Sequence, residues 1–259
     1  MKKKVQRLIK SSREIELLRV AGRHLAEVLT RVAGEVKEGI TTRELDLLSR
    51  EWIESVGDRP SFLNYKPAGV AIPFPATLCV SVNDEVVHGI PSDRVLYDGD
   101  IVSLDLGLWH QGVCVDAAVT VIVNAGDAQA MKLIEVTRQA LKEGVAAARG
   151  GGHVGDIGAA IEAYVKPYRY GIVQELGGHG VGLAVHEQPY IPNYGTRGTG
   201  PLLEAGMVLA IEPMLNEGSE EVKLALDKFT FSTVDGGRSA HFEHTVVITE
   251  GEPEVITIF

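Results

Sequence analysis

The chain has 259 residues, of which 45% are hydrophobic and 23% charged, which is typical of a globular protein with a sizeable core. Its formal net charge of −10 argues against general nucleic-acid binding, which needs a basic surface. The longest apolar runs are too short to span a bilayer, and the basic opening MKKK is not followed by the apolar part of a secretory signal. Cys79 and Cys114 have no zinc-site spacing, and two thiols do not make a disulfide scaffold. Since no secretory signal is recognised either, a reducing cytoplasm is the simplest compartment.

The first half of the chain predicts two helices followed by strands. Apolar residues recur at helical spacing over 11–36, with Ser12 as the candidate N-cap. A second helix is expected over 41–57, where Thr41 and Glu44 resemble a capping box. A long loop rich in Pro and Gly follows over 59–76. Strands are then expected at 77–82, 100–109 and 113–123.

The second half repeats this order. Helices are expected at 126–150 and 154–171, followed by strands near 173–178, 206–215 and 239–249. In both halves a carboxylate stands six residues after a glycine: Asp105 after Gly99, and Glu212 after Gly206. We therefore expect one α+β domain built from two similar halves, about 10–124 and 125–259. Helices would cover one side of a mostly antiparallel sheet, and a site between the halves would draw residues from both.

Carboxylates interrupt the predicted strands. Alternation places Asp105 on the face opposite Leu104 and Leu106, and the same reasoning applies to Asp116, Glu212 and Glu243. A single acid at a strand end is usually solvated or salt-bridged. A group of partly buried carboxylates needs a compensating cation, and Arg238 is the one basic residue close to them in the sequence. A divalent metal ion is the natural candidate.

The stretch GGHGVGLAVHE, at 177–187, holds His179 and His186 seven positions apart. Its glycines disfavour a helix, and an odd spacing would point the two rings to opposite faces of a strand, so we expect irregular backbone. His179 and the four carboxylates make a set that suits Mn, Fe, Co or a catalytic Zn. Bridging carboxylates could hold two metals, as in aminopeptidases, with His186 facing the substrate. A tightly bound structural metal is the alternative.

His88 stands in SVNDEVVHGIP, directly before a turn signal. A lone histidine in such a place is usually a surface or structural residue. The residues alone therefore assign it no function.

Taken together, the motifs resemble those of the type I methionine aminopeptidases, members of the pita-bread metallopeptidases. The matching stretches are SVNDEVVHGIP, DGDIVSLDLG, GGHGVGLAVHEQP, GMVLAIEPM and SAHFEHTVVIT, and the resemblance covers nearly the whole chain. It implies a pita-bread fold with two pseudo-symmetric halves, a curved antiparallel sheet covered by helices, and the active site between the halves. It also implies two divalent ions, of Co, Mn, Fe or Zn. The implied ligands are Asp105, Asp116, His179, Glu212 and Glu243, with Asp116 and Glu243 as bridges.

The resemblance further implies hydrolysis by a metal-bound hydroxide. His88 and His186 would contact the substrate, and Glu212 would carry a proton to the leaving amine. The 65–79 loop, which looks longer than in short bacterial members, would help to form the methionine pocket with Tyr65 and Cys79. Phe229 would stand beside that pocket, where many bacterial members have tryptophan.

The implied substrates are the N-terminal methionines of peptides and nascent proteins, preferably before a small second residue. We expect a cytoplasmic monomer that acts on nascent chains and binds neither specific nucleic acid nor membrane; contact with the ribosome is left open by the sequence. Two alternatives remain open from the sequence. One is an Xaa-Pro aminopeptidase or dipeptidase of the same fold, and the other is a non-catalytic peptide-binding relative.

Overall fold

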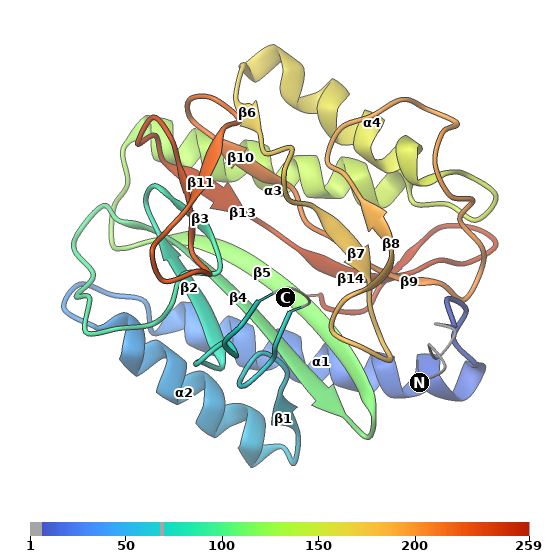
Figure 1. Cartoon of the computed structure of the whole chain (residues 1–259), viewed down its shortest axis with the longest axis horizontal. Coiled ribbons are helices and arrows are strands. Elements are labelled where there is room, and N and C mark those ends of the chain that lie inside the picture. The colour runs from blue at the N-terminus through green and yellow to red at the C-terminus, as the bar shows by residue number, and fades with distance from the viewer. Residues whose placement is uncertain (1–6, 68–69, 259) are drawn as a thin grey trace.

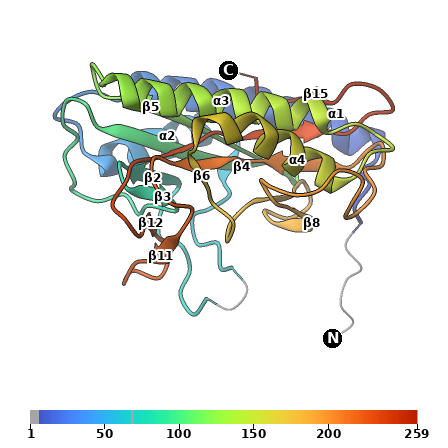
Figure 2. The same cartoon turned by 90° about the horizontal axis from the view of Figure 1, so that it is seen from above.

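The computed structural model describes residues 7–67 and 70–258, so the basic opening of the chain lies outside it. In this part of the chain the helices lie on one side of the sheets, with long loops on the other (Figure 2). The longer α-helices are α1 (Ser12–Gly34), α2 (Thr42–Ser55), α3 (Ala128–Ala147) and α4 (Val154–Val165). A short 3₁₀ helix, η1 (Lys166–Tyr168), follows α4. No helix among the described residues is long and apolar enough to cross a membrane.

Capping sets the starts of the first two helices. The N-cap of α1 is Ser11, not the expected Ser12, because the Ser11 side chain forms a reciprocal capping box with Glu14. The expected capping box of Thr41 with Glu44 is confirmed at the start of α2. Gly57 follows the end of this helix with a φ of +81°, a conformation that glycine adopts without strain.

Two larger antiparallel sheets form the core, one in each half (Figure 1). The first runs β1-β4-β2, with β5 also paired to β4, and the second runs β15-β14-β9-β7-β8. The strands of the first are β1 (Arg59–Pro60), β2 (Leu78–Val82), β4 (Ile101–His110) and β5 (Val113–Ile122). The strands of the second are β7 (Gly178–Gly180), β8 (Glu187–Ile191), β9 (Val208–Ile211), β14 (His244–Val247) and β15 (Glu254–Val255).

Two three-stranded sheets complete the fold, in the orders β13-β10-β6 and β11-β12-β3. Their strands are β3 (Glu85–Val87), β6 (Gly171–Ile172), β10 (Met214–Asn216), β11 (Val222–Leu224), β12 (Phe231–Thr233) and β13 (Ser239–His241). The first three expected helices and the three strands of the first half are confirmed within a few residues. The helix expected over 154–171 ends earlier, at Val165, and continues only as the 3₁₀ helix η1.

The strands of the second half differ from expectation. The prediction of a strand near 173–178 was wrong, because this segment lies between two strands: β6 ends at Ile172 and β7 begins at Gly178. The single strands expected at 206–215 and 239–249 are each broken, at Glu212–Pro213 and at Phe242–Glu243. Proline has no N–H to donate to a ladder, which accounts for the first break. Both breaks fall at a predicted ligand.

Hydrogen bonds across β5 join the two halves. Ala118 and Glu243 exchange backbone hydrogen bonds of 3.3 and 2.9 Å. The Asp116 N–H donates to Thr245 Oγ1 at 2.9 Å, and the Thr245 hydroxyl donates to the Asp116 carbonyl at 2.7 Å. The carboxylates of Asp116 and Glu243 are thereby brought together from segments more than a hundred residues apart.

Candidate active site

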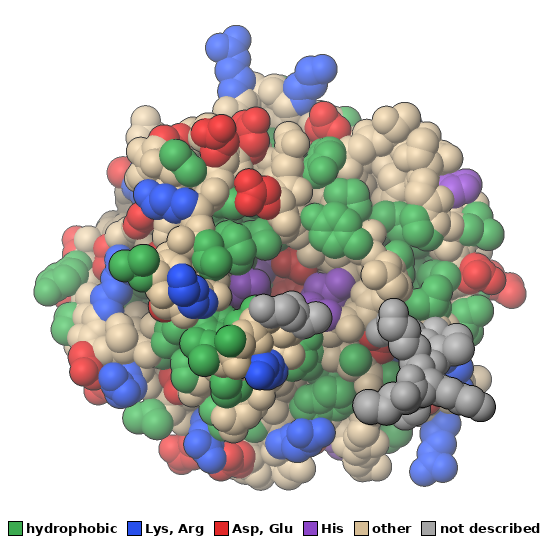
Figure 3. Space-filling model, viewed as in Figure 1, with side chains coloured by type: hydrophobic (Ala, Val, Ile, Leu, Met, Phe, Trp, Pro, Cys, Tyr) green, Lys and Arg blue, Asp and Glu red, His purple; other side chains and the backbone are tan. Residues whose placement is uncertain are grey.

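The five predicted ligands line a single cavity of about 80 Å³. Asp105 extends from β4, Asp116 from β5 and His179 from β7, while Glu212 directly follows β9 and Glu243 lies between β13 and β14. Asp116, His179 and Glu243 each offer one ligand atom, and these three atoms lie within 4.8 Å of one another. Figure 3 shows histidine and acidic side chains together in a recessed area near the middle of the visible face.

Glycines let the strand that carries His179 fit between its neighbours. A Cβ on Gly178 would lie 2.2 Å from the carbonyl oxygen of Ala210 in β9, and one on Gly180 would lie 2.1 Å from that of Gln188 in β8. The expectation of a stretch without regular structure was therefore wrong at 178–180, which form β7 with a register shift after His179. Gly178 and Gly180 thus serve close backbone approach rather than a turn.

Three carboxylates of this site each have one buried oxygen without a partner. Asp105 Oδ1, Asp116 Oδ1 and Glu243 Oε1 are buried and have no hydrogen-bond partner among the described residues. Burial raises the pKa of Asp105 to about 7. Burial, followed by the neighbouring carboxylates, raises the pKa of Asp116 and of Glu243 well above the usual range. Unpartnered acids gathered without a cation fit the binding of a divalent metal.

Glu212 is held by histidines. Its Oε1 lies 3.5 Å from His179 Nε2, and its Oε2 lies 3.5 Å from His241 Nε2. Burial acts to raise the pKa of Glu212, but the interaction with His241 and the charge of His179 outweigh it, so that this pKa is lowered. Glu212 is therefore the carboxylate of the set that ionises most easily.

His241 is a residue that the sequence analysis did not assign. It is 1% exposed, its Nε2 faces the Glu212 carboxylate at 3.5 Å, and its Nδ1 has no hydrogen-bond partner in the described structure. Its position two residues before Glu243, on the same predicted strand face, was the available signal. The contact with Glu212 could not be predicted because it crosses between separate strands.

Two further histidines border the cavity. His186 Nδ1 shares a hydrogen bond of 2.8 Å with the hydroxyl of Tyr65, and its ring meets that of His179 edge-on at 4.4 Å between centroids. Burial, followed by the charge of His179, lowers the pKa of His186 to about 3. Burial also lowers the pKa of His88. Both rings are thus neutral at physiological pH and can donate or accept a hydrogen bond.

An apolar wall faces these polar groups. The Phe74 and Phe229 rings pack edge-to-face with centroids 5.3 Å apart. Phe229, Tyr65 and Cys79, the predicted pocket residues, all line this cavity, together with Phe62 and Phe74, which were not predicted. Cys79 is opposite Asp105 in the β2–β4 ladder, and burial raises the pKa of its thiol, so it lines the pocket as a neutral group.

A second histidine–carboxylate group lies elsewhere, formed by His24, Asp58 and His110. Here His24 Nδ1 is 2.7 Å from Asp58 Oδ2, and His110 Nδ1 is 2.6 Å from Asp58 Oδ1. Both carboxylate oxygens are therefore satisfied by imidazoles, in contrast to the unpartnered oxygens of the cavity. This group acts as a hydrogen-bonded link between α1, the end of α2 and β4.

Comparison with known proteins first gives the class of fold. The chain superposes on the crystal structure of methionine aminopeptidase from Rickettsia prowazekii with a TM-score of 0.93 and 37% identity, covering 96% of this chain and 99% of that one. Prolidase from Pyrococcus furiosus also matches, with a TM-score of 0.79 and 25% identity, over 98% of this chain and 66% of that chain. The expected pita-bread fold is confirmed.

The sequence comparisons then give the family. The model of metallopeptidase family M24 matches residues 16–250. A protein of Aquifex aeolicus named methionine aminopeptidase is 45% identical over 251 residues, covering 95% of this chain and 97% of that protein. The chain belongs to metallopeptidase family M24, and use of a divalent metal follows from that membership.

Proposed function

We propose that this chain is an aminopeptidase that removes N-terminal methionine from peptides and nascent proteins, preferably before a small second residue. One observation carries the proposal: the carboxylate–histidine group and an apolar aromatic wall line the same cavity. In such a cavity an apolar substrate side chain would lie against the aromatic wall, beside the groups that hydrolyse the bond. Near-full-length likeness to proteins named methionine aminopeptidase supports it.

The five predicted ligands would hold two divalent ions. Asp116 and Glu243 would bridge them, Asp105 would complete one site, and His179 with Glu212 would complete the other. The unpartnered oxygens of Asp105, Asp116 and Glu243 fit this assignment. When bound, such ions activate a water molecule and polarise the scissile carbonyl. The oxygen-rich donor set suits Mn, Fe, Co or Zn.

The chain's own side chains orient the substrate and move the proton. His186 and His88, both neutral, lie on the cavity wall where they would hydrogen-bond the substrate. The Tyr65 hydroxyl fixes the orientation of the His186 ring through Nδ1, leaving Nε2 free to face the cavity. Glu212 has a lowered pKa and is therefore a carboxylate at rest; it would accept a proton from the attacking water and then pass that proton to the leaving amine.

The apolar wall would select the methionine side chain. Phe74 and Phe229 offer the ring edges that thioethers contact favourably. Phe62, Tyr65 and Cys79 would complete the pocket. We further propose that the protein acts as a cytoplasmic monomer, with 10–124 and 125–259 as pseudo-repeat halves of a single catalytic domain.

The test is the release of free amino acid from Met-Ala-Ser and from a matched Xaa-Pro peptide, with added Mn²⁺ and with a chelator control. Release of methionine that the chelator abolishes is the expected result. Release from the Xaa-Pro peptide alone would instead favour the activity named for the prolidase neighbour. Release from neither peptide by metal-loaded protein would favour a non-catalytic peptide-binding role and overturn the proposal.

A further inference from the structure

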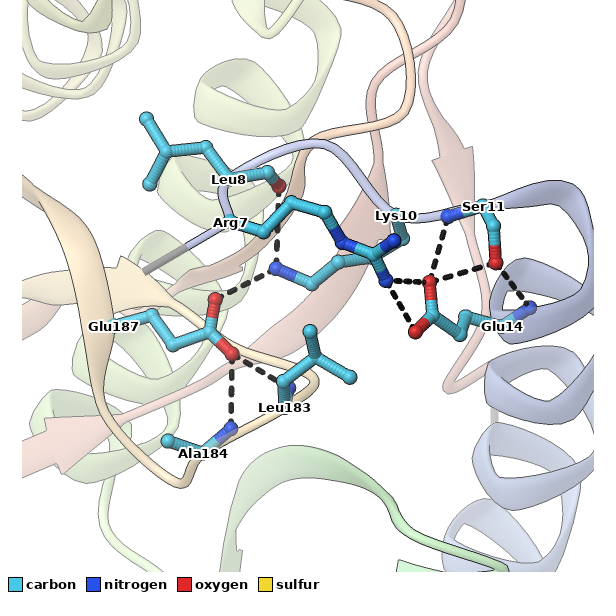
Figure 4. Close-up of polar contacts among 8 residues, drawn as sticks. All are labelled: Arg7, Leu8, Lys10, Ser11, Glu14, Leu183, Ala184 and Glu187. Atoms are coloured by element: carbon cyan, nitrogen blue, oxygen red, sulfur yellow. Dashed lines mark hydrogen bonds and ion pairs between the residues drawn. The ribbon is translucent and has the colours of Figure 1, made fainter. Parts of the chain in front are cut away.

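A buried ion pair joins the start of the described chain to the turn that carries His186. Lys10 Nζ lies 2.6 Å from Glu187 Oε2, and the two side chains are 1% and 0% exposed. Glu187 directly follows His186 in the sequence. Figure 4 shows Lys10 reaching from the N-terminal segment to the Glu187 carboxylate beside the backbone of Leu183 and Ala184.

The Glu187 carboxylate closes the turn before His186. Its Oε1 accepts hydrogen bonds from the backbone N–H groups of Leu183, at 2.5 Å, and Ala184, at 2.9 Å (Figure 4). Its Oε2 binds Lys10, so both oxygens are occupied. Because the residues on either side of His186 are fixed in this way, the direction in which the imidazole leaves the backbone is fixed as well.

The Lys10 side chain packs directly on the same turn. A Cβ on Gly182 would lie 2.7 Å from Lys10 Cε, and Gly182 has a φ of +131°, so a side chain at this position would both clash and strain the backbone. The carbonyl of Gly182 accepts a hydrogen bond of 2.7 Å from the N–H of Cys114, two residues before Asp116. The turn is thus held between Lys10 and the strand of a predicted metal ligand.

Lys10 is itself anchored. Its backbone N–H donates to the carbonyl of Gly206 at 2.8 Å, and its Nζ donates to that of Leu8 at 3.2 Å. Ile9 forms an isolated antiparallel bridge with Met207, directly before β9. The N-terminal segment is therefore attached both to the turn of His186 and to the strand that leads to Glu212.

We propose that Lys10 and Glu187 are positioning residues for His186, an inference that rests on the function proposed above. A buried ion pair stabilises a fold weakly, because desolvation of both charges offsets their attraction. What this pair provides is a fixed geometry, since the carboxylate has specific partners on three residues of two segments. Docking of the N-terminal segment then determines whether His186 is aimed into the cavity.

The test uses Lys10→Met, which keeps the length of the side chain and removes its charge, and Glu187→Gln, which keeps the shape of the carboxylate. Arg7→Gln is the matched control, because Arg7 pairs with Glu14 on the same segment without touching the turn (Figure 4). For each protein, kcat and KM are measured on Met-Ala-Ser, together with hydrogen exchange of the Leu183 and Ala184 amides and with bound metal.

We expect Lys10→Met and Glu187→Gln to lower kcat by about 10- to 100-fold, with faster exchange of both amides and unchanged metal content, because misplacing one group by about an ångström has effects of this size. KM should change less than kcat if the lost contact is made mainly in the transition state. Arg7→Gln should match the wild type. In protein that already carries His186→Ala, adding Lys10→Met should lower kcat by less than about threefold. The reason is that both substitutions remove the same contribution to kcat, that of a correctly placed His186 imidazole.

Lys10→Met with wild-type kcat and unchanged amide exchange would overturn the inference, whatever its thermal stability. The inference would also be overturned if Lys10→Met lowered kcat as much in the His186→Ala protein as in the wild type, since Lys10 would then act on catalysis without His186. A wild-type protein that releases no methionine would instead refute the proposed function, and the amide exchange would still report whether the pair orders the turn.

Discussion

Asp116 occupies the most demanding position of the site, because it is buried, faces other carboxylates and has an unpartnered oxygen. Replacing it by Asn keeps the shape but removes the charge that a bridging ligand must supply. We expect Asp116→Asn to lower kcat/KM more than about 100-fold, since changes outside the ligand set already have effects of 10- to 100-fold. Metal content by mass spectrometry and methionine release, measured on one preparation, check this, and full activity with full metal content would refute the assignment.

The hydrogen bond between Tyr65 and His186 predicts a smaller effect. Tyr65→Phe removes the hydroxyl that lies 2.8 Å from His186 Nδ1 but keeps the ring in the pocket wall. A hydrogen bond of this kind contributes about 1 kcal/mol, so kcat/KM for Met-Ala-Ser should fall about fivefold to tenfold. An unchanged kcat/KM in steady-state assays would show that Tyr65 does not orient His186.

For single residues, the sequence indicated the acidic side chains of the site better than it indicated the residues that contact acidic side chains. Strand alternation and the shortage of nearby cations single out Asp105, Asp116, Glu212 and Glu243, because these are local properties of the sequence. His241 was not assigned, since its contact with Glu212 joins two strands whose pairing no local pattern reports. The role of Lys10 was not predicted for the same reason, because Glu187 is 177 residues away.

At the scale of the elements, β7 is tightly confined by its neighbours β8 and β9. A methyl group on Gly178 would lie 2.2 Å from the Ala210 carbonyl, so β7 and β9 would have to move apart and His179 would move with them. We expect Gly178→Ala to weaken metal binding and lower kcat/KM at least about tenfold. Calorimetric metal titration and peptide assays measure both.

Gly34→Ala is the matched control for that substitution. Gly34 ends α1, and nothing lies within 4 Å of a Cβ placed there. Alanine should leave activity unchanged and stabilise the helix by up to about 1 kcal/mol. If Gly34→Ala weakened metal binding as much as Gly178→Ala, the loss could not be attributed to a displacement of β7.

Helices and first-half strands could be predicted because capping residues and hydrophobic periodicity are local signals. The expected capping box of Thr41 with Glu44, for example, is present in α2. The strands of the second half could not be predicted as well, since Pro213 and the Phe242–Glu243 break divide runs that look continuous in the sequence. Short strands such as β7 depend on their neighbours rather than on their own residues.

For the whole molecule, the central carboxylates make stability depend on metal and on pH. An unfolded Asp titrates near 3.8, whereas burial raises the pKa of Asp105 in the metal-free fold to about 7. Between these values the native state binds more protons than the unfolded state, so this group lowers stability as the pH rises from about 4 to about 7. Burial and the neighbouring carboxylates also raise the pKa values of Asp116 and Glu243 well above their usual range, so these two groups act on stability in the same direction.

We therefore expect chelation to lower the melting temperature, and to lower it more at pH 8 than at pH 5. Scanning calorimetry of metal-loaded and metal-stripped protein at both pH values measures the difference. If the difference in melting temperature between metal-loaded and metal-stripped protein were smaller at pH 8 than at pH 5, the assignment of these carboxylates as metal ligands would be contradicted.

The most direct test of the account is the position of bound metal in crystals grown with Mn²⁺, located by anomalous scattering. We predict density between the carboxylates of Asp116 and Glu243, within reach of Asp105, His179 and Glu212. Density confined to the group of His24, Asp58 and His110, or absent from the cavity at saturating Mn²⁺, would contradict the central claim that the carboxylate–histidine cavity is the metal centre of this peptidase.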